Sequence, residues 1–457
     1  IYQQLATKAA TTIYGRVLEQ YPQHPDALHL MGLVDANQGR VTLTISRIRE
    51  AVSLLPSSDD YYLSLIDILK KQDCYEKAEL VAKEMTVAFP NSPKSYAVRA
   101  ELEQRRGALE KAERNRRRAI ELGPEIATYR GELGYMLEQQ NRLEEAERCV
   151  LQGLQREPKN LLCRLVLAKC LRRAGQVEEA FRRLETELEV DNAACQFELG
   201  RLCDMTGRYE QAWRYWERGN RLTESAEAHT AKPDRLLNEA FALYQLYQSS
   251  LIKHFSTITC VDPCERVFVS GFPRSGTSLV HHRLCQSNQV VGRHEPGTLL
   301  AVKSAMQQFS RGYPASIATL TDQQVSLLHQ IYDHAFQFSG TCLQRQENAD
   351  KRVILDTNPH HLIDAGLLTR LFPTARFVYM VRHPLDVVLS CFMKHFRLTD
   401  LTANFCSIER TVETYEVMMT LWRTTVQQLP HQCRVVRYEE LIQSPENVLD
   451  DLRQWLG

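Results

Sequence analysis

The sequence lacks an excess of charge of either sign, and it lacks long hydrophobic runs. Lysine plus arginine and aspartate plus glutamate number 56 each, so no global field recruits nucleic acid or an anionic membrane. No apolar run approaches the ~18 residues that a membrane-spanning helix needs. We therefore expect neither a nucleic-acid partner nor a membrane span, and any site for an anion must be local.

The distribution of cysteine gives no sign of a disulfide framework. The chain has 13 cysteines, an odd number, and several of them fall beside aliphatic residues in helical patterns. We expect buried free thiols in a reducing compartment, and hence a cytoplasmic location. Cys260 and Cys264 form a C-x3-C pair without a second pair, which is a weak pattern for a metal site. The chain starts without methionine and inside a repeat, so a targeting segment ahead of Ile1 stays open.

The first half of the chain repeats with a period of 34 residues. Prolines recur in one register, at Pro22, Pro56, Pro90, Pro124 and Pro158. Small residues hold two further phases, at Ala78, Ala112, Ala146, Ala180 and Ala212 and at Gly32, Gly134 and Gly200. Small residues let two helices cross closely, and proline ends a helix because it lacks a backbone donor. The pattern resembles the tetratricopeptide repeat, which implies an all-α solenoid whose concave groove binds an extended partner.

We predict three parts in the chain. Residues 1–226 form the tetratricopeptide array, residues 227–264 form a helical adaptor, and residues 265–457 form a second domain. The adaptor holds an amphipathic helix at 234–255 without the repeat phase, which we expect to seal the solenoid. The array recruits an acceptor, or it serves only as a scaffold or dimer interface. Helical arrays often self-associate, so a homo-oligomer is among the expected partners.

Short β-branched and aromatic runs alternate with helical stretches in the second domain. The runs lie at 266–270, 352–356, 376–381 and 433–438, with a further strand-like stretch at 289–292. Strands that alternate with helices predict a parallel sheet with right-handed crossovers, as in α/β domains of the P-loop type. Ligands bind beyond the carboxyl ends of such strands, where polar residues follow here.

The stretch GFPRSGTS at 271–278 is almost a nucleotide-binding loop, but it lacks a lysine. A nucleoside triphosphatase has G-x-x-x-x-G-K-[ST], and here Thr277 stands where the lysine belongs. The glycines permit a tight turn, and the N–H groups at the following helix start face an anion. We therefore predict a cradle for one phosphate or phosphosulfate, and we disfavour an ATP-dependent kinase. The predicted cradle residues are Arg274, Ser275, Gly276, Thr277 and Ser278.

A second candidate anion site lies in VRHPLDVVLSCFMKHF at 381–396. Arg382 ends a predicted strand, and Ser390 and Lys394 are four residues apart, which places them on one face of a predicted helix. An arginine, a hydroxyl and a lysine that meet suit a dianionic phosphate. An ordinary solvated helix face is the alternative.

These two motifs and RYEELIQSPE at 437–446 resemble the sulfotransferase family over residues 265–457. Joined to the repeats, they resemble tetratricopeptide sulfotransferases, and the domain is similar to protein-tyrosine sulfotransferases. The resemblance implies the sulfotransferase fold and 3′-phosphoadenosine 5′-phosphosulfate as sulfuryl donor, adenosine 3′,5′-bisphosphate as product, and no metal. By position, the first loop holds the 5′-phosphosulfate, and Arg274 neutralises the bridging oxygen. Arg382, Ser390 and Lys394 hold the 3′-phosphate, with Tyr438 beside it.

The reaction also needs a general base, because a hydroxyl with a pKa of about 10 or higher attacks poorly at neutral pH. The resemblance assigns this role to Glu295, with the neighbouring His294 as the competing candidate. A structural carboxylate paired with an arginine is the alternative role of Glu295. The pair His281-His282 is a poor metal site, because adjacent helical residues point about 100° apart.

Two departures from the family bear on activity. Thr357 stands where relatives often carry a lysine that stabilises the leaving group, so Arg274 or Lys351 must compensate. Family members also continue past the position of Gly457 into further nucleotide contacts. A repeat-based interaction protein with a nucleotide-binding, catalytically weak domain is therefore the alternative function. A groove favours a peptide or protein tyrosine as acceptor, while glycans, lipids and natural-product hydroxyls stay open.

Overall fold

The structure is a computed structural model of the chain. It describes residues 2–72, 74–185, 191–227, 231–248, 252, 265–287, 290–294, 297–338 and 353–456. The chain divides into two compact units, Ile1–Gln176 and Val177–Gly457. Within the described ranges, no helix is both long and apolar enough to cross a membrane.

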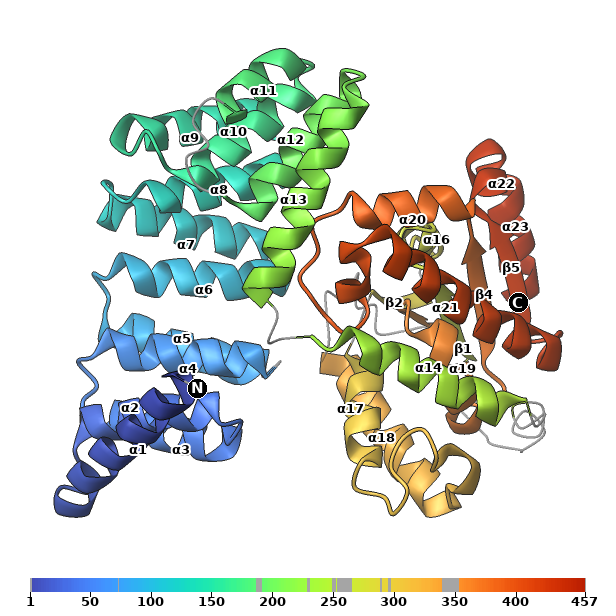
Figure 1. Cartoon of the computed structure of the whole chain (residues 1–457), viewed down its shortest axis with the longest axis horizontal. Coiled ribbons are helices and arrows are strands. Elements are labelled where there is room, and N and C mark those ends of the chain that lie inside the picture. Colours follow the sequence, from blue (N-terminus) through green and yellow to red (C-terminus); the bar gives the residue numbers. More distant parts are fainter. Residues whose placement is uncertain are drawn as a thin grey trace. The chain divides into compact units, whose positions relative to one another are not determined.

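The first unit consists of antiparallel helices that stack in sequence order (Figure 1). They are α1 (Tyr2–Gln20), α2 (Pro25–Asn37), α3 (Val41–Leu54), α4 (Asp59–Lys71), α5 (Tyr75–Ala88), α6 (Pro93–Arg105), α7 (Leu109–Leu122), α8 (Ala127–Gln139), α9 (Leu143–Arg156) and α10 (Leu161–Arg173). The prolines of the period each follow the last residue of a helix by two, as Pro56 follows α3 and Pro124 follows α7. As predicted, these prolines mark where the second helix of each pair ends.

Small residues of the period lie where paired helices cross. Ala112 and Ala146 are fully buried, and a Cβ added to Gly134 of α8 would lie 2.4 Å from Cγ1 of Val150 on α9. Any larger side chain there would force the two helices apart. The predicted tetratricopeptide solenoid is confirmed by this packing together with the family match given below.

The second unit begins with α11 (Val177–Glu185), α12 (Ala193–Met205) and α13 (Tyr209–Glu227), which keep the repeat phase. These helices therefore pack as part of the compact unit that also holds the sheet. We predicted the domain limits at residues 226 and 264 from the phase of the repeat, whereas the compact units divide after Gln176. The predicted limits therefore stay a prediction. Cys260 and Cys264 lie outside the described residues.

A five-stranded parallel sheet forms the centre of the second unit. Its strand order is β2-β3-β1-β4-β5. The strands are β1 (Glu265–Gly271), β2 (Val290–His294), β3 (Val353–Thr357), β4 (Arg376–Val381) and β5 (Cys433–Arg437). The apolar runs of the sequence predicted all five strands, because buried parallel strands are continuous in β-branched and aromatic residues.

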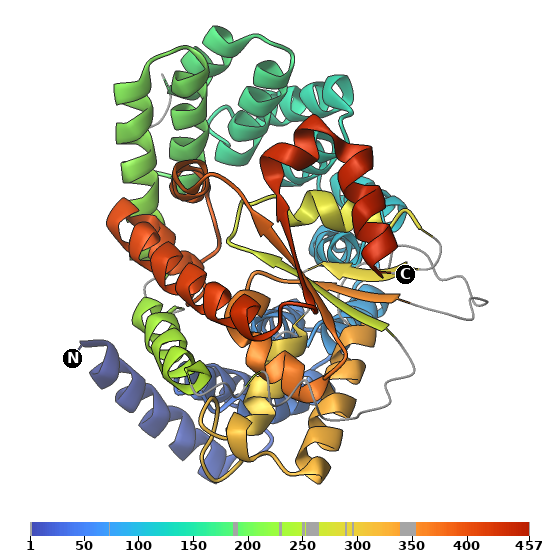
Figure 2. The same ribbon diagram turned by 90° about the vertical axis from the view of Figure 1, so that its right-hand side faces the viewer.

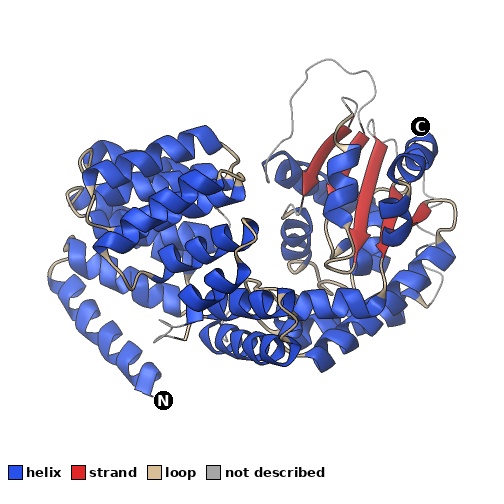
Figure 3. Cartoon of the chain, turned by 90° about the horizontal axis from the view of Figure 1, so that it is seen from above, coloured by secondary structure: helices blue, strands red, loops and turns tan. Residues whose placement is uncertain are grey.

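Helices cover both faces of the sheet (Figures 2 and 3). Alternate strand residues supply two cores, since successive side chains of a strand point to opposite faces. Val267 and Val269 of β1 pack with α16 (Thr277–Leu284), α22 (Tyr438–Gln443) and α23 (Pro445–Leu456). Phe268 belongs to the core on the other side of the sheet. The helices that contribute to this core are α14 (Pro233–Tyr247), α17 (Thr298–Met306), α18 (Asp322–Phe338), α19 (His361–Leu371), α20 (Pro384–Phe392) and α21 (Ile408–Gln428). Two short 3-10 turns, η1 (Ile317–Thr319) and η2 (Thr402–Cys406), complete this side.

The predicted adaptor helix is a core element of the sheet domain. Tyr247 at the end of α14 is fully buried, and its hydroxyl donates to the carbonyl of Ile363 at 3.1 Å. The same hydroxyl accepts from the backbone N–H of Gly366 at 3.2 Å. A Cβ at Gly366 would lie 2.4 Å from the Tyr247 ring, so the glycine permits α14 to lie directly against α19.

Candidate functional site

The sheet has a switch point between β1 and β4. These two strands are neighbours, but the chain leaves β1 through α16 toward β2 on one edge. It leaves β4 through α20 and α21 toward β5 on the opposite edge. A crevice forms where connections diverge beyond the carboxyl ends of parallel strands, and this crevice is where such sheets bind ligands. Both predicted anion motifs lie at this point.

The loop after β1 turns through two residues with positive φ. Arg274 has φ 73° and Gly276 has φ 101°. A non-glycine residue in this region is uncommon and costs free energy, so the surrounding contacts must hold Arg274 there. Ser275, only 1% exposed, donates its backbone N–H to Phe272, while its buried side-chain oxygen has no partner among the described residues. The loop therefore holds an unsatisfied polar atom at the start of α16.

Replacing Gly276 by alanine should displace the loop. The new Cβ would lie 2.6 Å from the Tyr438 ring, and alanine at φ 101° adds strain of about 1–2 kcal/mol. We expect the affinity for adenosine 3′,5′-bisphosphate, the nucleotide that the resemblance implies, to fall about tenfold or more in a titration calorimeter. The matched control is Gly297→Ala, because no atom lies within 4 Å of a Cβ at Gly297. Equal affinity of the Gly276 variant and the wild type would contradict the proposed cradle.

The two predicted anion motifs meet directly. Nε of Arg274 donates to Oγ of Ser390 at 2.9 Å, and Arg382 donates to the backbone oxygen of Arg274 at 3.4 Å. The Arg382 guanidinium lies 4.6 Å from the centre of the Tyr438 ring, a cation–π distance. Nε of Arg382 is buried and has no partner in the described part of the chain. Four predicted site residues are thus brought together around the switch point.

The prediction that Ser390 and Lys394 share a helix face is wrong. Helix α20 ends at Phe392, so Lys394 lies past the helix end, with an exposed side chain. The backbone N–H of Lys394 bonds three residues back, to the carbonyl of Cys391 at 3.2 Å. The four-residue spacing rule holds only inside a helix, and the sequence pattern did not reveal this terminus.

Helix α20 is held from two sides. The Cys391 thiol donates to the carbonyl of Pro273 in the loop at 3.4 Å. On the other side, the buried Asn220 amide of α13 donates to the carbonyl of Phe392 at 3.0 Å, and the Trp213 ring lies 4.9 Å from the Phe392 ring. Sequence reasoning missed Asn220. The signal that could have indicated it is a polar residue at a position of a repeat helix where the periodic pattern expects a buried apolar one.

The ends of β2 and β3 also converge on α16. Nε2 of His294 and Oγ of Ser278 are hydrogen-bonded at 2.9 Å, and Nδ1 of His281 and Oγ1 of Thr357 at 2.8 Å. Thr357 is fully buried, so its hydroxyl serves the packing of α16 on β3. It supplies no charge at the position where relatives are expected to carry a lysine. Glu295 and Lys351 lie outside the described residues, and their predicted roles stay predictions.

Acid should destabilise the second unit through His281. Burial, with smaller contributions from His294 and His282, lowers the pKa of His281 to about 4. Because this pKa lies below the ordinary value of 6.5, the stabilisation is present above pH 6.5 and is lost as the pH falls toward 4. The expected loss is about 3 kcal/mol, measured by urea unfolding across this range. His281→Gln should show a flatter pH dependence, and an identical slope would contradict the assignment.

No group of three or more histidine, cysteine, aspartate or glutamate residues is placed to hold a metal ion among the described residues. The adjacent residues His281 and His282 lie in different surroundings. His281 is buried against Thr357 and Cys285, while the His282 side chain is exposed. The described cysteines are free thiols, and burial raises the pKa of Cys391 to about 12.

A parallel sheet with a glycine loop between β1 and α16 defines a P-loop-like α/β domain, and the stacked helix pairs define a tetratricopeptide array. Comparison with known families agrees. Residues 266–457 match the family model described as the sulfotransferase family, and residues 98–160 match a tetratricopeptide repeat model. Residues 266–457 therefore belong to the sulfotransferase family, and the chain joins such a domain to tetratricopeptide repeats.

Curated relatives are distant. An uncharacterized protein of Aquifex aeolicus (strain VF5) is 25% identical over 202 residues, covering 41% of this chain and 25% of that protein. Protein-tyrosine sulfotransferase 2 of Gallus gallus is 24% identical over 199 residues, covering 42% of this chain and 50% of that protein. Nodulation protein NoeE of Sinorhizobium fredii (strain NBRC 101917 / NGR234) is 23% identical over 208 residues, covering 42% and 49%. The chain thus spans half or less of the length of these relatives.

Solved structures with similar helical stacking include pilF of Pseudomonas aeruginosa. It has a TM-score of 0.37 and 18% identity, and the likeness covers 43% of this chain and 91% of that one. YrrB, a tetratricopeptide protein, has a TM-score of 0.29 and 15% identity, with 38% and 90% covered. Likeness at these levels carries no statement about function.

Proposed function

We propose that this protein transfers the sulfuryl group of 3′-phosphoadenosine 5′-phosphosulfate to an acceptor hydroxyl, with a peptide or protein tyrosine as the favoured class. One observation carries the proposal. A lysine-free phosphate loop and a second basic motif meet at the switch point of the sheet, through Arg274, Ser390 and Arg382. Membership of the domain in the sulfotransferase family supports sulfuryl transfer in general.

The residues present suit this donor. Oγ of Ser275 and Nε of Arg382 are buried polar atoms without partners among the described residues, and a bound anion satisfies such donors. The loop from Arg274 to Ser278 would hold the 5′-phosphosulfate through backbone N–H groups at the start of α16. Arg382, Ser390 and Lys394 would hold the 3′-phosphate, with the Tyr438 ring against Arg382.

The 3′-phosphate pocket would also set specificity. The Nε donor of Arg382 has no partner among the described residues, and ATP, which carries no 3′-phosphate, would leave it so, while a second nitrogen of Arg382 contacts Asp386 at 3.3 Å. Sites with buried polar groups reject ligands that leave those groups unpaired. The missing loop lysine also disfavours ATP, because Thr277 at that position carries no positive charge for a γ-phosphate.

The chain's own work in the reaction is positioning and charge stabilisation. The bound donor supplies an activated sulfuryl group that transfers in line to an oxygen nucleophile. Arg274 would stabilise the negative charge that develops on the leaving phosphate oxygen. Its hydrogen bond to Ser390 orients the guanidinium before the donor binds, which reduces the reorganisation needed. Glu295 would accept the proton of the acceptor hydroxyl.

Substitution of Glu295 by glutamine should lower kcat by about 10²–10⁴-fold with little effect on nucleotide affinity. The neighbouring His294 supplies the matched control. Its Nε2 is hydrogen-bonded to Ser278, so His294→Gln should keep most of the activity and weaken donor binding modestly. Steady-state transfer rates at saturating donor separate the two candidates. Full activity of the Glu295 variant together with loss in the His294 variant would reverse the assignment.

Transfer itself is tested with donor carrying labelled sulfate. The protein is incubated with this donor and a panel of tyrosine peptides, glycans, lipids and small hydroxyl compounds. We expect labelled product from the tyrosine peptides without added metal. Label on another acceptor class would keep the sulfotransferase proposal and correct the acceptor, whereas no labelled product from any acceptor would contradict the proposal.

The alternative function is a repeat-based interaction protein with a nucleotide-binding but catalytically weak domain. Thr357 favours it, because this buried residue supplies no charge at the position of the family lysine. The alternative predicts tight binding of adenosine 3′,5′-bisphosphate together with negligible transfer. Thr357→Lys is not a clean test, because the lysine would lose the bond to His281 and enter the core.

A further inference from the structure

A pocket of about 380 Å³ lies in the first unit between α7, α8 and α9. Leu133 and Leu137 of α8 are buried at its floor, and Ile120 of α7 adds to the apolar wall. Its polar lining is arginine, glutamate and glutamine with one thiol, namely Arg117, Glu121, Arg130, Glu145, Arg148, Cys149 and Gln152. None of these residues belongs to the proposed sulfotransfer site.

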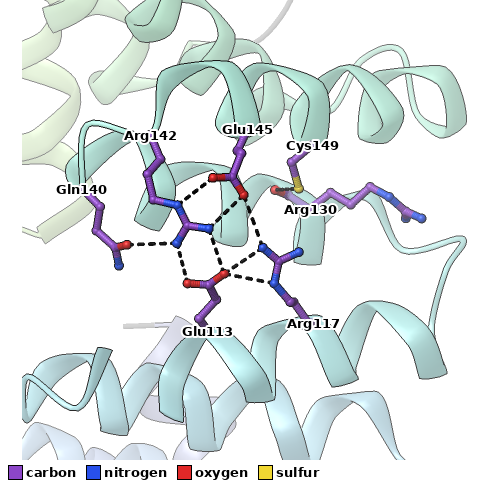
Figure 4. Close-up of polar contacts among 7 residues, drawn as sticks. All are labelled: Glu113, Arg117, Arg130, Gln140, Arg142, Glu145 and Cys149. Carbon is purple, nitrogen blue, oxygen red and sulfur yellow. Dashed lines mark hydrogen bonds and ion pairs between the residues drawn. The ribbon is translucent and has the colours of Figure 1, made fainter. Parts of the chain in front are cut away.

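The acidic side of the lining is already neutralised. Arg142 bridges Glu145 at 2.8 Å and Glu113 at 2.7 Å, and Arg117 also contacts Glu113 at 2.7 Å (Figure 4). Hydrogen bonds from Arg142 are the main cause that lowers the pKa of Glu113 and of Glu145. Both carboxylates therefore stay ionised and paired near neutral pH, and neither needs a ligand.

The other lining carboxylate is paired as well. Glu121 lies 2.8 Å from Arg118, its neighbour on α7, which is not a pocket residue. The carboxylates of the pocket thus have basic partners, two of them supplied by residues behind or beside the lining. Within the described ranges, the unpaired charge of the pocket therefore comes from its other arginines, Arg130 and Arg148.

Two of the three lining arginines have no carboxylate partner among the described residues. Arg130 gives one N–H to the carbonyl of Pro124, and its guanidinium points away from the charge network in Figure 4. Arg148 is exposed on α9 and forms no ion pair within the described part of the chain. A guanidinium carries five N–H donors in a planar fork that matches a carboxylate, so most of these donors are available to a ligand.

We propose that this pocket binds an acidic peptide segment of a partner protein, with one apolar side chain on the Leu133–Leu137 floor and flanking carboxylates on Arg130 and Arg148. The apolar floor provides burial, and the two arginines provide charge complementarity and register. The volume admits one large aliphatic side chain with its neighbours, so the contact is a short anchor rather than a broad interface.

The proposal is tested with a fluorescein-labelled peptide that carries one leucine between paired aspartates. A second peptide has asparagine at every aspartate, and a third has serine in place of the leucine. Fluorescence anisotropy should show binding of the first peptide, at least tenfold weaker binding of each of the others, and weakening as salt rises.

Variants of the full chain decide where the peptide binds. Arg148→Glu and Arg130→Gln should each weaken the acidic peptide about tenfold or more. Arg114→Glu is the matched control, because Arg114 is exposed on α7 outside the pocket and should change affinity less than threefold. Circular dichroism checks that each variant is folded. Equal binding of acidic and neutral peptides, unchanged affinity in Arg148→Glu, or displacement by a single-stranded oligonucleotide would overturn the proposal.

This inference is independent of the sulfotransfer proposal. The pocket belongs to the unit Ile1–Gln176, and the proposed nucleotide residues belong to Val177–Gly457. Arg148→Glu should therefore bind adenosine 3′,5′-bisphosphate as the wild type does. Loss of peptide binding alone, or of nucleotide binding alone, identifies which proposal fails.

Discussion

Replacing Arg274 by alanine should slow sulfuryl transfer by about 10³-fold or more. Removal of a fixed cation at the position where charge develops is among the most costly changes in group-transfer enzymes. In the wild type Nε of Arg274 donates to Ser390 at 2.9 Å, and this bond is lost in the alanine variant, whereas the backbone oxygen that accepts from Arg382 stays. Loss of this side chain therefore removes charge and also frees Ser390.

Single-turnover transfer of labelled sulfate measures this effect apart from nucleotide binding. Arg274→Lys should recover only part of the rate, because lysine keeps the charge but lacks the planar fork. Arg453→Ala is the matched control, since the Arg453–Asp450 pair of α23 is exposed and contributes little. A rate within tenfold of wild type for Arg274→Ala would show that Arg274 does not stabilise the leaving group.

Lys303→Met should destabilise the second unit by about 3–5 kcal/mol. Nζ of Lys303 lies 2.6 Å from Glu239 of α14 and 2.7 Å from Asp364 of α19, and Asp364 is fully buried. Tyr313 also donates to Asp364. Removing Lys303 leaves the two poorly solvated carboxylates together, and an uncompensated buried charge has this cost.

Urea unfolding monitored by tryptophan fluorescence measures the change. Lys94→Met is the control, because its pair with Asp59 is largely exposed and should contribute no more than about 1 kcal/mol. Adding Asp364→Asn to Lys303→Met should restore part of the loss, since it removes the uncompensated charge. A loss below about 1 kcal/mol for Lys303→Met would contradict the account of the cluster.

Patterns local in sequence predicted most of the fold. Proline at a fixed phase marked helix ends, as at Pro90 after Ala88, because the missing N–H acts on the residues beside it. The strand at 376–381 was predicted to the residue, because a buried parallel strand needs an unbroken apolar run. The phosphate loop could be found for the same reason, since strand, glycines and helix follow each other directly.

Contacts between distant residues could not be predicted in this way. Nothing near Thr357 indicated that its hydroxyl bonds His281 in the core, 76 residues away. The bond from Asn220 to the carbonyl of Phe392 joins residues 172 apart, and it depends on how α13 packs on α20. The end of α20 before Lys394 was missed, because tertiary contacts rather than a glycine or proline mark it.

Adenosine 3′,5′-bisphosphate binding tests the central claim most directly. We predict that, without magnesium, this nucleotide binds at least about 100-fold more tightly than ATP in a titration calorimeter. Ser390→Ala and Arg382→Ala should each remove much of that preference, because both residues are proposed to hold the 3′-phosphate. Equal or tighter binding of ATP, or an unchanged preference in both variants, would contradict the proposed donor site.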